Sequence, residues 1–307
     1  MELNIINLFN AMPGACAQGL IWGIMAIGVY ITYKILDLAD LTVDGTMCTG
    51  GAVCVVMILN GFPVWISLLF AFLAGVIAGL VTGLLHTAMG IPAILAGILT
   101  QLGLYSINLR IMGGKANQAL NVDKYDLLVS LRYIKGVPIS QNTILVAAVL
   151  ALLLIGILYW FFGTELGCAI RATGSNSNMS RAQGINTDRM KIFGLMLSNG
   201  IVAFASGLYA QYQGFSEINA GRGAIVIGLA AVIIGEVIFG KISPNFAFKL
   251  LSVVLGAIIY YLVLQVVLWL GLNSNDLKLL SAVVVAVFLA VPYMKGRYFS
   301  KPVKKGG

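Results

Sequence analysis

Residues 144–162 read ILVAAVLALLLIGILYWFF, a run without a single charged side chain. A helix of about 20 apolar residues crosses a hydrocarbon core of about 30 Å. A transmembrane β-barrel would instead show segments of about 10 residues that alternate apolar and polar side chains, and this run does not alternate. Because backbone N–H and C=O groups in lipid must be satisfied within their own segment, the run predicts a transmembrane α-helix.

Similar runs recur along the whole chain of 307 residues, which is 60% hydrophobic and 10% charged. Soluble domains carry roughly 25% charged residues. We therefore predict an all-α polytopic membrane protein that forms one transmembrane domain, 1–307. The first run lacks a basic region before it and a convincing cleavage site, so we expect a retained helix rather than a signal peptide. About nine membrane segments are expected, at roughly 13–33, 45–60, 63–87, 91–112, 142–162, 191–212, 223–239, 247–270 and 278–294.

The distribution of basic residues predicts the orientation of the chain. The formal net charge is +8, but the charges are scattered over loops and a tail, so we expect no nucleic-acid partner. Lys and Arg accumulate in cytoplasmic loops, which assigns the segment 163–191 and the tail 295–307 to the cytoplasm. An even number of segments lies between them, so the two assignments agree. Counting backwards places the N-terminus and the loop 113–141 outside.

Two short polar breaks suggest an internal repeat. LADLTVDGT (38–46) follows the first segment, GFSEINAGRG (214–223) follows the sixth, and each precedes a short apolar segment. The first segment runs inward and the sixth runs outward, which predicts two inverted repeats at about 13–112 and 191–294. Interrupted segments at corresponding positions of inverted halves indicate a transport path near the midplane.

The breaks supply polar candidates for such a path, because irregular backbone at membrane depth is tolerated only beside protein or water. Other roles stay open: Asp44 as the N-cap of the next helix, the second break as an exposed turn, and Glu236 as the partner of a basic residue near the cytoplasmic interface. The candidates for the path are Asp40, Thr42, Asp44, Thr46, Glu217, Asn219, Arg222 and Glu236.

The sequence contains no motif for catalysis or ATP binding. GEVIFGKI (235–242) fits G-x4-G-K, but Ile242 stands where a phosphate loop needs Ser or Thr to bind magnesium. The four cysteines show no metal-ligand spacing. We therefore predict no enzymatic activity, no catalytic residue, no metal site and no cofactor in this chain.

Glycines at every fourth position mark the third segment: Gly75, Gly79 and Gly83. Such small-residue ridges let helices approach closely. We interpret them as packing within the subunit, with dimerisation as the alternative.

The segment RATGSNSNMSRAQGINTDRMK (171–191) is a polar island between apolar runs. Its pattern predicts a short helix at 177–184 that ends at Gly184, followed by a helix capped by Asn186 or Thr187. A short helix held between two membrane helices can dock in a groove of a soluble partner and transmit that partner's motion. The alternative is an ordinary basic cytoplasmic loop.

Three motifs together resemble one family. They are DLTVDGT (40–46) with GGAV (50–53), GSNSNMSRAQGIN (174–186) and GLAAVIIGE (228–236). IPAILAGILTQLGLYSINLRIMG (91–113) is also typical. The chain resembles, over nearly its whole length, the permease subunits of bacterial ABC importers of the branched-chain amino acid and ribose type. Within that type it is similar to permeases that work with binding proteins for amino acids, including aromatic ones.

The resemblance implies a subunit of the bacterial cell membrane that forms a homodimer. It also implies ABC ATPase subunits on the cytoplasmic face, which bind ATP and magnesium, and an external binding protein that delivers a small polar solute. The polar island would contact the ATPase. Ser180 departs from an expected alanine, and Arg222 stands where a small or apolar residue is expected. The residues expected to couple to the ATPase are Arg171, Gly174, Asn176, Arg181, Gly184, Ile185, Asn186, Asp188 and Arg189.

Two rival functions follow from the same features. A secondary transporter driven by an ion gradient also has inverted repeats and broken helices, and it needs a buried carboxylate at mid-membrane. A membrane scaffold is the third possibility, but it has no use for paired polar interruptions.

Overall fold

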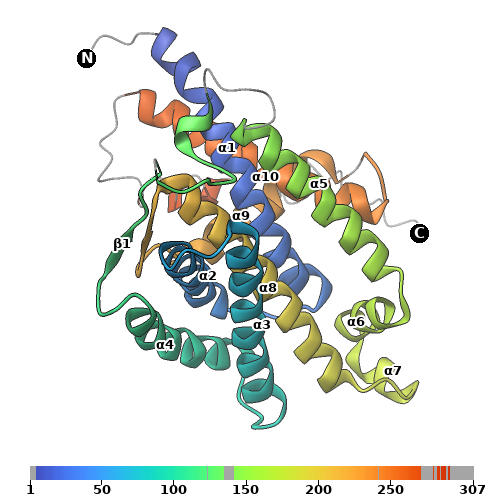
Figure 1. The fold of residues 1–307 in the computed structure, drawn as a ribbon. Helices are drawn as coiled ribbons and strands as arrows, with labels where there is room; N and C mark the ends of the chain where they lie inside the picture. The colour runs from blue at the N-terminus through green and yellow to red at the C-terminus, as the bar shows by residue number, and fades with distance from the viewer. Residues whose placement is uncertain are drawn as a thin grey trace, which may run out of the picture.

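The computed structural model describes residues 5–122, 124–134, 142–240 and 242–270, together with 279, 282–283, 285–287 and 290. These residues are mostly helical (Figure 1). Within them, seven helices are long and apolar enough to span a membrane. The helices are α1 (Ile5–Tyr30), α2 (Thr42–Leu59), α3 (Val64–Thr87), α4 (Ala93–Ile111), α5 (Thr143–Phe162), α6 (Glu165–Ser175), α7 (Ser177–Ala182), α8 (Thr187–Gln213), α9 (Ala224–Phe239) and α10 (Phe246–Trp269).

The predicted count of nine segments is not reached in this part of the chain. Seven predicted segments correspond to α1, α2, α3, α4, α5, α8 and α10. The eighth is α9, which is apolar but has only 16 residues. The ninth, 278–294, lies mostly outside the described residues, and the basic tail 295–307 lies wholly outside them.

The first helix does not end as a regular α-helix. It continues into one π-helical turn, η1 (Ile31–Ile35), directly before the first polar break. Isolated π-turns are rare in proteins overall, and those that occur often lie at functional sites. Thr32 lies inside this turn, and its hydroxyl donates a hydrogen bond of 3.1 Å to the Val29 carbonyl.

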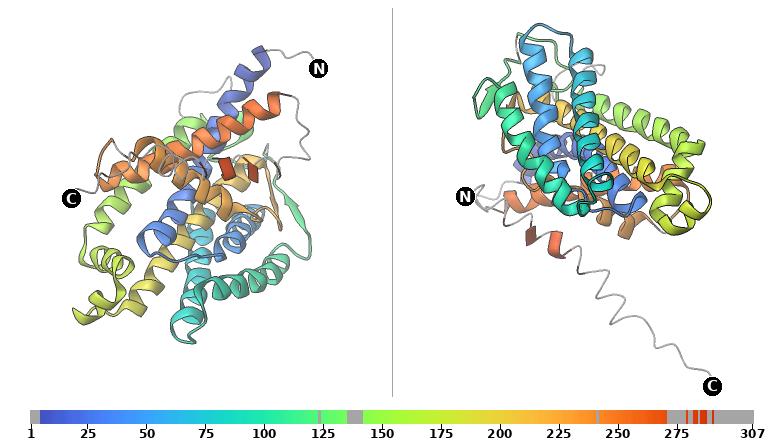
Figure 2. Two further views of the ribbon diagram at one scale, coloured as in Figure 1. Left: turned by 180° about the vertical axis from the view of Figure 1, so that it is seen from behind. Right: turned by 90° about the horizontal axis from the view of Figure 1, so that it is seen from below.

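The helices pack across the two halves of the chain. α8 lies along α2 and α3, whereas α1 lies along α9 and α10. Seen from behind, the orange α10 follows the blue α1 (Figure 2). Most of α1, α2 and α8 is buried, whereas α4 and α5 are largely exposed. The hydrophobic core therefore lies around α1 and α8.

Close approach of α3 to α8 depends on the glycine ridge. A methyl group added at Gly75 or Gly79 would overlap backbone atoms of Asn199 or Leu195 in α8. At Gly83 it would meet Ile192 at 3.0 Å. The ridge thus packs within the subunit, as the spacing predicts.

A small sheet corrects the purely helical prediction. β1 (Asn117–Ala119) pairs antiparallel with β2 (Phe215–Glu217), with Asn117 opposite Glu217 and Ala119 opposite Phe215. β1 belongs to the predicted loop 113–141, and β2 belongs to the second polar break. Sequence periodicity cannot show such a pairing, because each strand is only three residues long and the partners are far apart in the chain.

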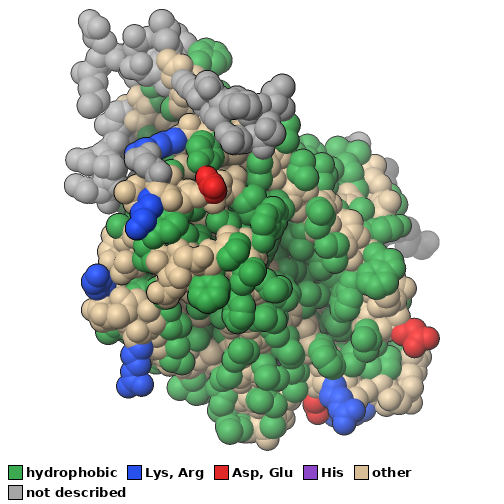
Figure 3. Space-filling view, viewed as in Figure 1, with side chains coloured by type: hydrophobic (Ala, Val, Ile, Leu, Met, Phe, Trp, Pro, Cys, Tyr) green, Lys and Arg blue, Asp and Glu red, His purple; other side chains and the backbone are tan. Residues whose placement is uncertain are grey.

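The bundle has two distinct ends. The end with the strands, here the β end, also holds the start of α1, because the Tyr212 hydroxyl donates to the Gly14 carbonyl at 3.1 Å. The other end, here the α7 end, carries α6, α7 and the end of α1. Apolar side chains cover the centre of the face in Figure 3, and charged side chains lie towards its margins. This arrangement is that of a multi-pass membrane protein.

Candidate functional site

A buried polar cluster joins the first break to the middle of α8. Asp40 is 3% exposed and lies in the connection between the first two spans. Its carboxylate accepts hydrogen bonds from the Thr42 backbone N–H at 2.9 Å and from the Asn199 amide at 2.7 Å. The Thr46 hydroxyl donates to the amide oxygen of Asn199 at 2.7 Å. Burial raises the pKa of the Asp40 carboxyl, and the hydrogen bonds from Thr42 and Asn199 oppose this shift.

Thr42 also begins a chain of buried hydroxyl groups across three helices. Its Oγ1 lies 2.7 Å from that of Thr82 in α3, and the Thr82 hydroxyl donates to Thr100 of α4 at 2.9 Å. These hydroxyls satisfy one another, so in this conformation Thr42 holds helices together rather than facing a cavity.

Asp44 joins the two breaks. The sequence suggests that it caps α2, but in the structure it caps the start of α9. α2 begins at Thr42, so Asp44 lies inside its first turn and is not its N-cap. The Asp44 carboxylate instead accepts hydrogen bonds from the backbone N–H groups of Gly223 at 3.0 Å and Ile225 at 2.9 Å, at the start of α9. Gly223 adopts a φ of +85°, which favours glycine. A carboxylate at this position complements the positive end of the α9 dipole.

Cys48 makes a second connection between the breaks. Its thiol donates to the Ile218 carbonyl at 3.1 Å, and its sulfur accepts from the Gly221 backbone N–H at 3.2 Å. This role could not be predicted from the sequence, because a cysteine in an apolar helix ordinarily acts as a small hydrophobe.

A pocket of about 280 Å³ opens where the breaks meet α4. Asp44, Cys48, Tyr105, Asn108 and Arg222 are among the residues that line it. The amide of Asn108 is fully buried, and neither its nitrogen nor its oxygen has a hydrogen-bond partner in the described structure. Buried amides normally have hydrogen-bond partners. The amide of Asn108 therefore leaves a donor and an acceptor unsatisfied in the wall of this pocket.

The remaining candidates for the path lie elsewhere. Glu217 is exposed in β2, and Asn219 is half-buried in the turn before α9. Glu236 forms an ion pair of 2.9 Å with Lys34 of η1, and both side chains are about half exposed. Of the two roles that the sequence left open for Glu236, the structure shows the pairing with a basic residue.

The polar island contains the predicted short helix and the start of the next span, together with the end of a further helix. α6, which the sequence did not predict, occupies Glu165–Ser175, and α7 is shorter than the predicted helix 177–184. Asn176 caps α7 by accepting from the Met179 N–H, and Asn186 caps α8 by accepting from the Arg189 N–H. Gly184 adopts a φ of +85° after α7, as predicted for a helix terminator.

One ion pair and one side-chain hydrogen bond connect α7 to α8. The Arg181 guanidinium donates to the Thr187 hydroxyl at 3.0 Å and lies 3.6 Å from the Asp188 carboxylate. All three side chains belong to the link between the short helix and the next span. Side-chain contacts therefore hold the α7–α8 corner together. Met179 of α7 has 59% of its surface exposed.

α6 lies against the π-turn at the end of α1. Gly174 contacts the backbone of Ile35 and Leu36 so closely that any side chain there would overlap them. Arg171 lies over the Phe246 ring at the start of α10, with its guanidinium carbon 5.3 Å from the ring centroid. The polar island thus touches the end of the first span and the start of α10.

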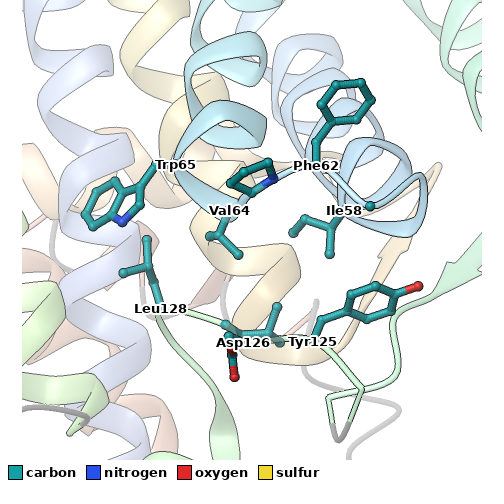
Figure 4. Close-up of a pocket in the computed structure, with 10 residues that line it drawn as sticks. Ile58, Phe62, Val64, Trp65, Tyr125, Asp126 and Leu128 are labelled. Atoms are coloured by element: carbon teal, nitrogen blue, oxygen red, sulfur yellow. The ribbon is translucent and has the colours of Figure 1, made fainter.

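A separate hollow of about 480 Å³ lies beside the turn between α2 and α3, away from all these contacts. Phe62, Val64 and Trp65 line one side of it and Tyr125 and Leu128 the other (Figure 4). It contains none of the predicted site residues.

Comparison with known proteins identifies the family. A family model described as "Branched-chain amino acid transport system / permease component" matches residues 12–292. The chain belongs to this permease family.

Relatives of this permease share most of its length. The "Tyrosine transport system permease protein" of Clostridioides difficile is 41% identical over 273 residues, which cover 89% of this chain and 88% of that one. "Uncharacterized protein RP368" of Rickettsia prowazekii is 33% identical over 92% of this chain and 97% of that one. The "Autoinducer 2 import system permease protein LsrC" of Yersinia pseudotuberculosis is 35% identical over 61% of this chain and 51% of that one. Among solved structures, PsaBC from Streptococcus pneumoniae in complex with Fab matches with a TM-score of 0.43 and 15% identity, over 85% of this chain and 95% of that one.

Sequence reasoning missed several of the polar side chains that the permease buries. Asn199 and Asn108 are fully buried, and both lie inside apolar helices. Polar residues within membrane segments are costly to bury and therefore informative. A search for single amides within apolar runs would have found both.

Proposed function

We propose that this chain is the translocation subunit of an ATP-driven ABC importer for an amino acid or similar small polar solute. Membership of the permease family supports transport. The absence of a phosphate loop from the sequence supports a separate ATPase as the source of energy.

One observation carries the coupling to that ATPase. Gly174 of α6 lies directly against Ile35 of the π-turn, and the π-turn precedes the break that contains Asp40 and Asp44. A displacement of α6 and α7 would therefore reach the polar cluster through the short segment 36–40, which joins the π-turn to Asp40. ATP-driven closure of the partner would move the α7 end and open or close the path between the breaks.

The partners follow from this proposal. A second copy of the chain would complete a homodimer, ATPase subunits that bind ATP and magnesium would dock on the α7 end, and an external binding protein would deliver the solute at the β end. The α7 end would be cytoplasmic, with the N-terminus outside and the C-terminus inside the bacterial cell membrane. Arg171, Gly174, Asn176, Arg181, Gly184, Ile185, Asn186, Asp188 and Arg189 would form or support the ATPase contact.

The packing supports two inverted repeats. α2 and α3 of the first half lie on α8, the first helix of the second half, and α9 and α10 lie reciprocally on α1. Such exchange is expected when two halves are related by a pseudo-two-fold axis and the transport path lies at their interface. Asp40, Thr46, Asp44 and Arg222 would border that path.

An amino acid is the preferred solute because of the relatives. The C. difficile protein is named for tyrosine transport and is 41% identical over nearly the whole chain. The LsrC proteins are named for a different solute, and their match covers only part of either chain. The external binding protein would supply most of the selectivity.

An ion-driven secondary transporter is the second candidate, and the burial of Asp40 favours it. Such a carrier needs an ionisable group inside the membrane. Glu236 does not meet this need, because it is half exposed and paired with Lys34. Of the two carboxylates in the acidic break, Asp40 is buried, whereas Asp44 is half-buried and caps α9, so Asp40 is the better candidate.

Reconstitution separates the two functions. The purified chain is placed in liposomes with and without its ATPase and binding protein, and uptake of radiolabelled L-tyrosine and L-leucine is measured together with ATP hydrolysis. The proposal expects uptake only with the ATPase and ATP. Uptake by the chain alone under a proton or sodium gradient, lost in Asp40→Asn, would establish the ion-driven carrier instead.

A further inference from the structure

Four aromatic rings from three helices gather near the β end. Trp22 of α1 meets Tyr209 of α8 edge-on, with ring centroids 5.5 Å apart, and meets Tyr261 of α10 at 5.8 Å. Tyr261 meets Tyr260 edge-on at 5.4 Å. All four side chains line one cavity of about 500 Å³. Residues of α1, α8, α9 and α10 and of the turn before α9 line this cavity.

An unpaired polar group points to an occupant of this cavity. Trp22 is 5% exposed, and its indole N–H is buried without an acceptor in the described structure. A buried tryptophan N–H usually finds a hydrogen-bond partner, and an unsatisfied donor is costly. The N–H is inaccessible in this arrangement, so an occupant with an oxygen atom would satisfy it only after a neighbouring ring moves.

Arg222 adds a positive charge to the rim of the same cavity. It belongs to the break before α9, its side chain is exposed, and it forms no ion pair with the described residues. The neighbouring carboxylate of Asp44 is occupied by the N–H groups at the start of α9. Arg222 also lines the 280 Å³ pocket between the breaks, so this one residue borders both cavities. A carboxylate is the natural partner of such a group, because a guanidinium binds one through two parallel hydrogen bonds.

We propose that this cavity is a subsite of the permease for an aromatic amino acid in transit. The ring of the solute packs among Trp22, Tyr209 and Tyr261, and its carboxylate binds Arg222. The volume is in the range of small-molecule sites, which are mostly apolar with a few placed polar groups. Edge-to-face contacts favour an aromatic ring over an aliphatic side chain of similar size. This inference rests on the proposed function, which makes a small amino acid the solute.

Direct binding tests the subsite without the ATPase. The full-length chain in lipid nanodiscs is titrated with L-tyrosine, with tyramine, which lacks the carboxylate, and with L-leucine, which lacks the ring. Tyrosine is expected to bind at least tenfold more tightly than either of the other two. Arg222→Gln should abolish the preference for tyrosine over tyramine. Trp22→Leu should abolish the preference for tyrosine over leucine.

Matched variants separate binding from folding. Trp160→Leu and Arg110→Gln change exposed residues outside the cavity, and they should bind all three probes as the wild type does. Trp22→Phe keeps a ring but removes the N–H, so it should retain the preference for tyrosine over leucine with weaker binding overall. Thermal unfolding checks that each variant is folded.

Three results would overturn the subsite. They are the absence of tyrosine binding by the wild-type chain at millimolar concentration, equal affinity for tyrosine and leucine, and unchanged binding in both Arg222→Gln and Trp22→Leu. The uptake assay with ATPase and binding protein is read separately. ATP-dependent uptake that is indifferent to these variants rejects the subsite alone, whereas tyrosine binding without ATP-dependent uptake rejects the proposed function alone.

Discussion

Asn199 donates a hydrogen bond of 2.7 Å to Asp40, which lies 159 positions earlier in the chain. The same amide accepts the Thr46 hydroxyl through its oxygen. One side chain of α8 therefore satisfies two polar groups of the opposite half. The polar cluster joins the two halves of the bundle rather than belonging to either one.

Asn199→Ala should destabilise the protein by about 1–3 kcal/mol, because it leaves the Asp40 carboxylate and the Thr46 hydroxyl buried without this partner. Thermal unfolding in detergent measures the loss. Asn60→Ala serves as the control, since Asn60 is exposed at the end of α2. Equal melting temperatures for the two variants would contradict a joining role for Asn199.

Asp44→Ala should weaken the start of α9 by about 1 kcal/mol, the usual cost of losing a capping side chain. Hydrogen–deuterium exchange should become faster at Gly223 and Ile225, whose N–H groups it caps. Asp44→Asn keeps an acceptor oxygen and should show a smaller change. If alanine and asparagine behave alike, capping is not the role of this carboxylate.

Arg181→Glu should uncouple ATP hydrolysis from transport in the reconstituted complex. It replaces the contacts with Thr187 and Asp188 by repulsion between two carboxylates, which loosens the α7–α8 corner. The measured quantity is the number of ATP molecules hydrolysed per solute imported, which should rise several-fold. Arg110→Glu makes the same charge change at the end of α4, outside the polar island, and should leave the ratio unchanged. A normal ratio in Arg181→Glu would argue against coupling through this corner.

Gly184→Val should affect the same corner through the backbone. A φ of +85° costs a residue with a side chain about 1–2 kcal/mol, so α7 should shift or fray while the spans stay folded. Transport should fall more than thermal stability does. Normal ATP-driven uptake in this variant would show that the geometry of the α7 terminus is not needed.

Gly79→Ala should destabilise the bundle by about 1–3 kcal/mol, the usual range for overpacking, since its methyl group would overlap the Leu195 backbone in α8. Gly156→Ala is the matched control, because a methyl group at Gly156 in α5 meets no atom of the described residues within 4 Å. Unfolding in a graded series of detergents compares them. Equal stability would mean that the two helices can separate without cost.

Much of the architecture follows from sequence because a membrane span is a local property. The run 144–162 forms α5, and Gly184 follows α7 at positive φ, as predicted. Both features are encoded locally, one in the length of an apolar run and the other in a single glycine. α6 was not predicted, because it has only 11 residues and lacks a long apolar stretch. The β1–β2 pair was not predicted, because pairing between distant short segments leaves no periodic signal in the sequence.

Only part of the candidate site could be predicted from the sequence. Asp40 and Asp44 stood out as carboxylates in an apolar context, and both turned out to be structurally engaged. Their partners did not stand out: Asn199 is a single amide within a long helix, and the N–H groups of Gly223 and Ile225 have no side-chain signature. Residue type can mark a polar group in a membrane protein, but only the fold shows which group satisfies it.

The exchange of helices between the halves has a consequence for biogenesis. When the ribosome has delivered α1 to α4 to the membrane, Asp40 and Thr46 are present, but Asn199 has not yet been synthesised. The nascent first half must therefore keep a carboxylate hydrated or shielded inside the insertion machinery until α8 arrives, because an unpaired charge in lipid is costly. A chain truncated before α8 should be retained by chaperones or degraded rather than accumulate as a stable half. Pairing of Asp40 and Thr46 with Asn199 would then distinguish a complete chain from an incomplete one during quality control.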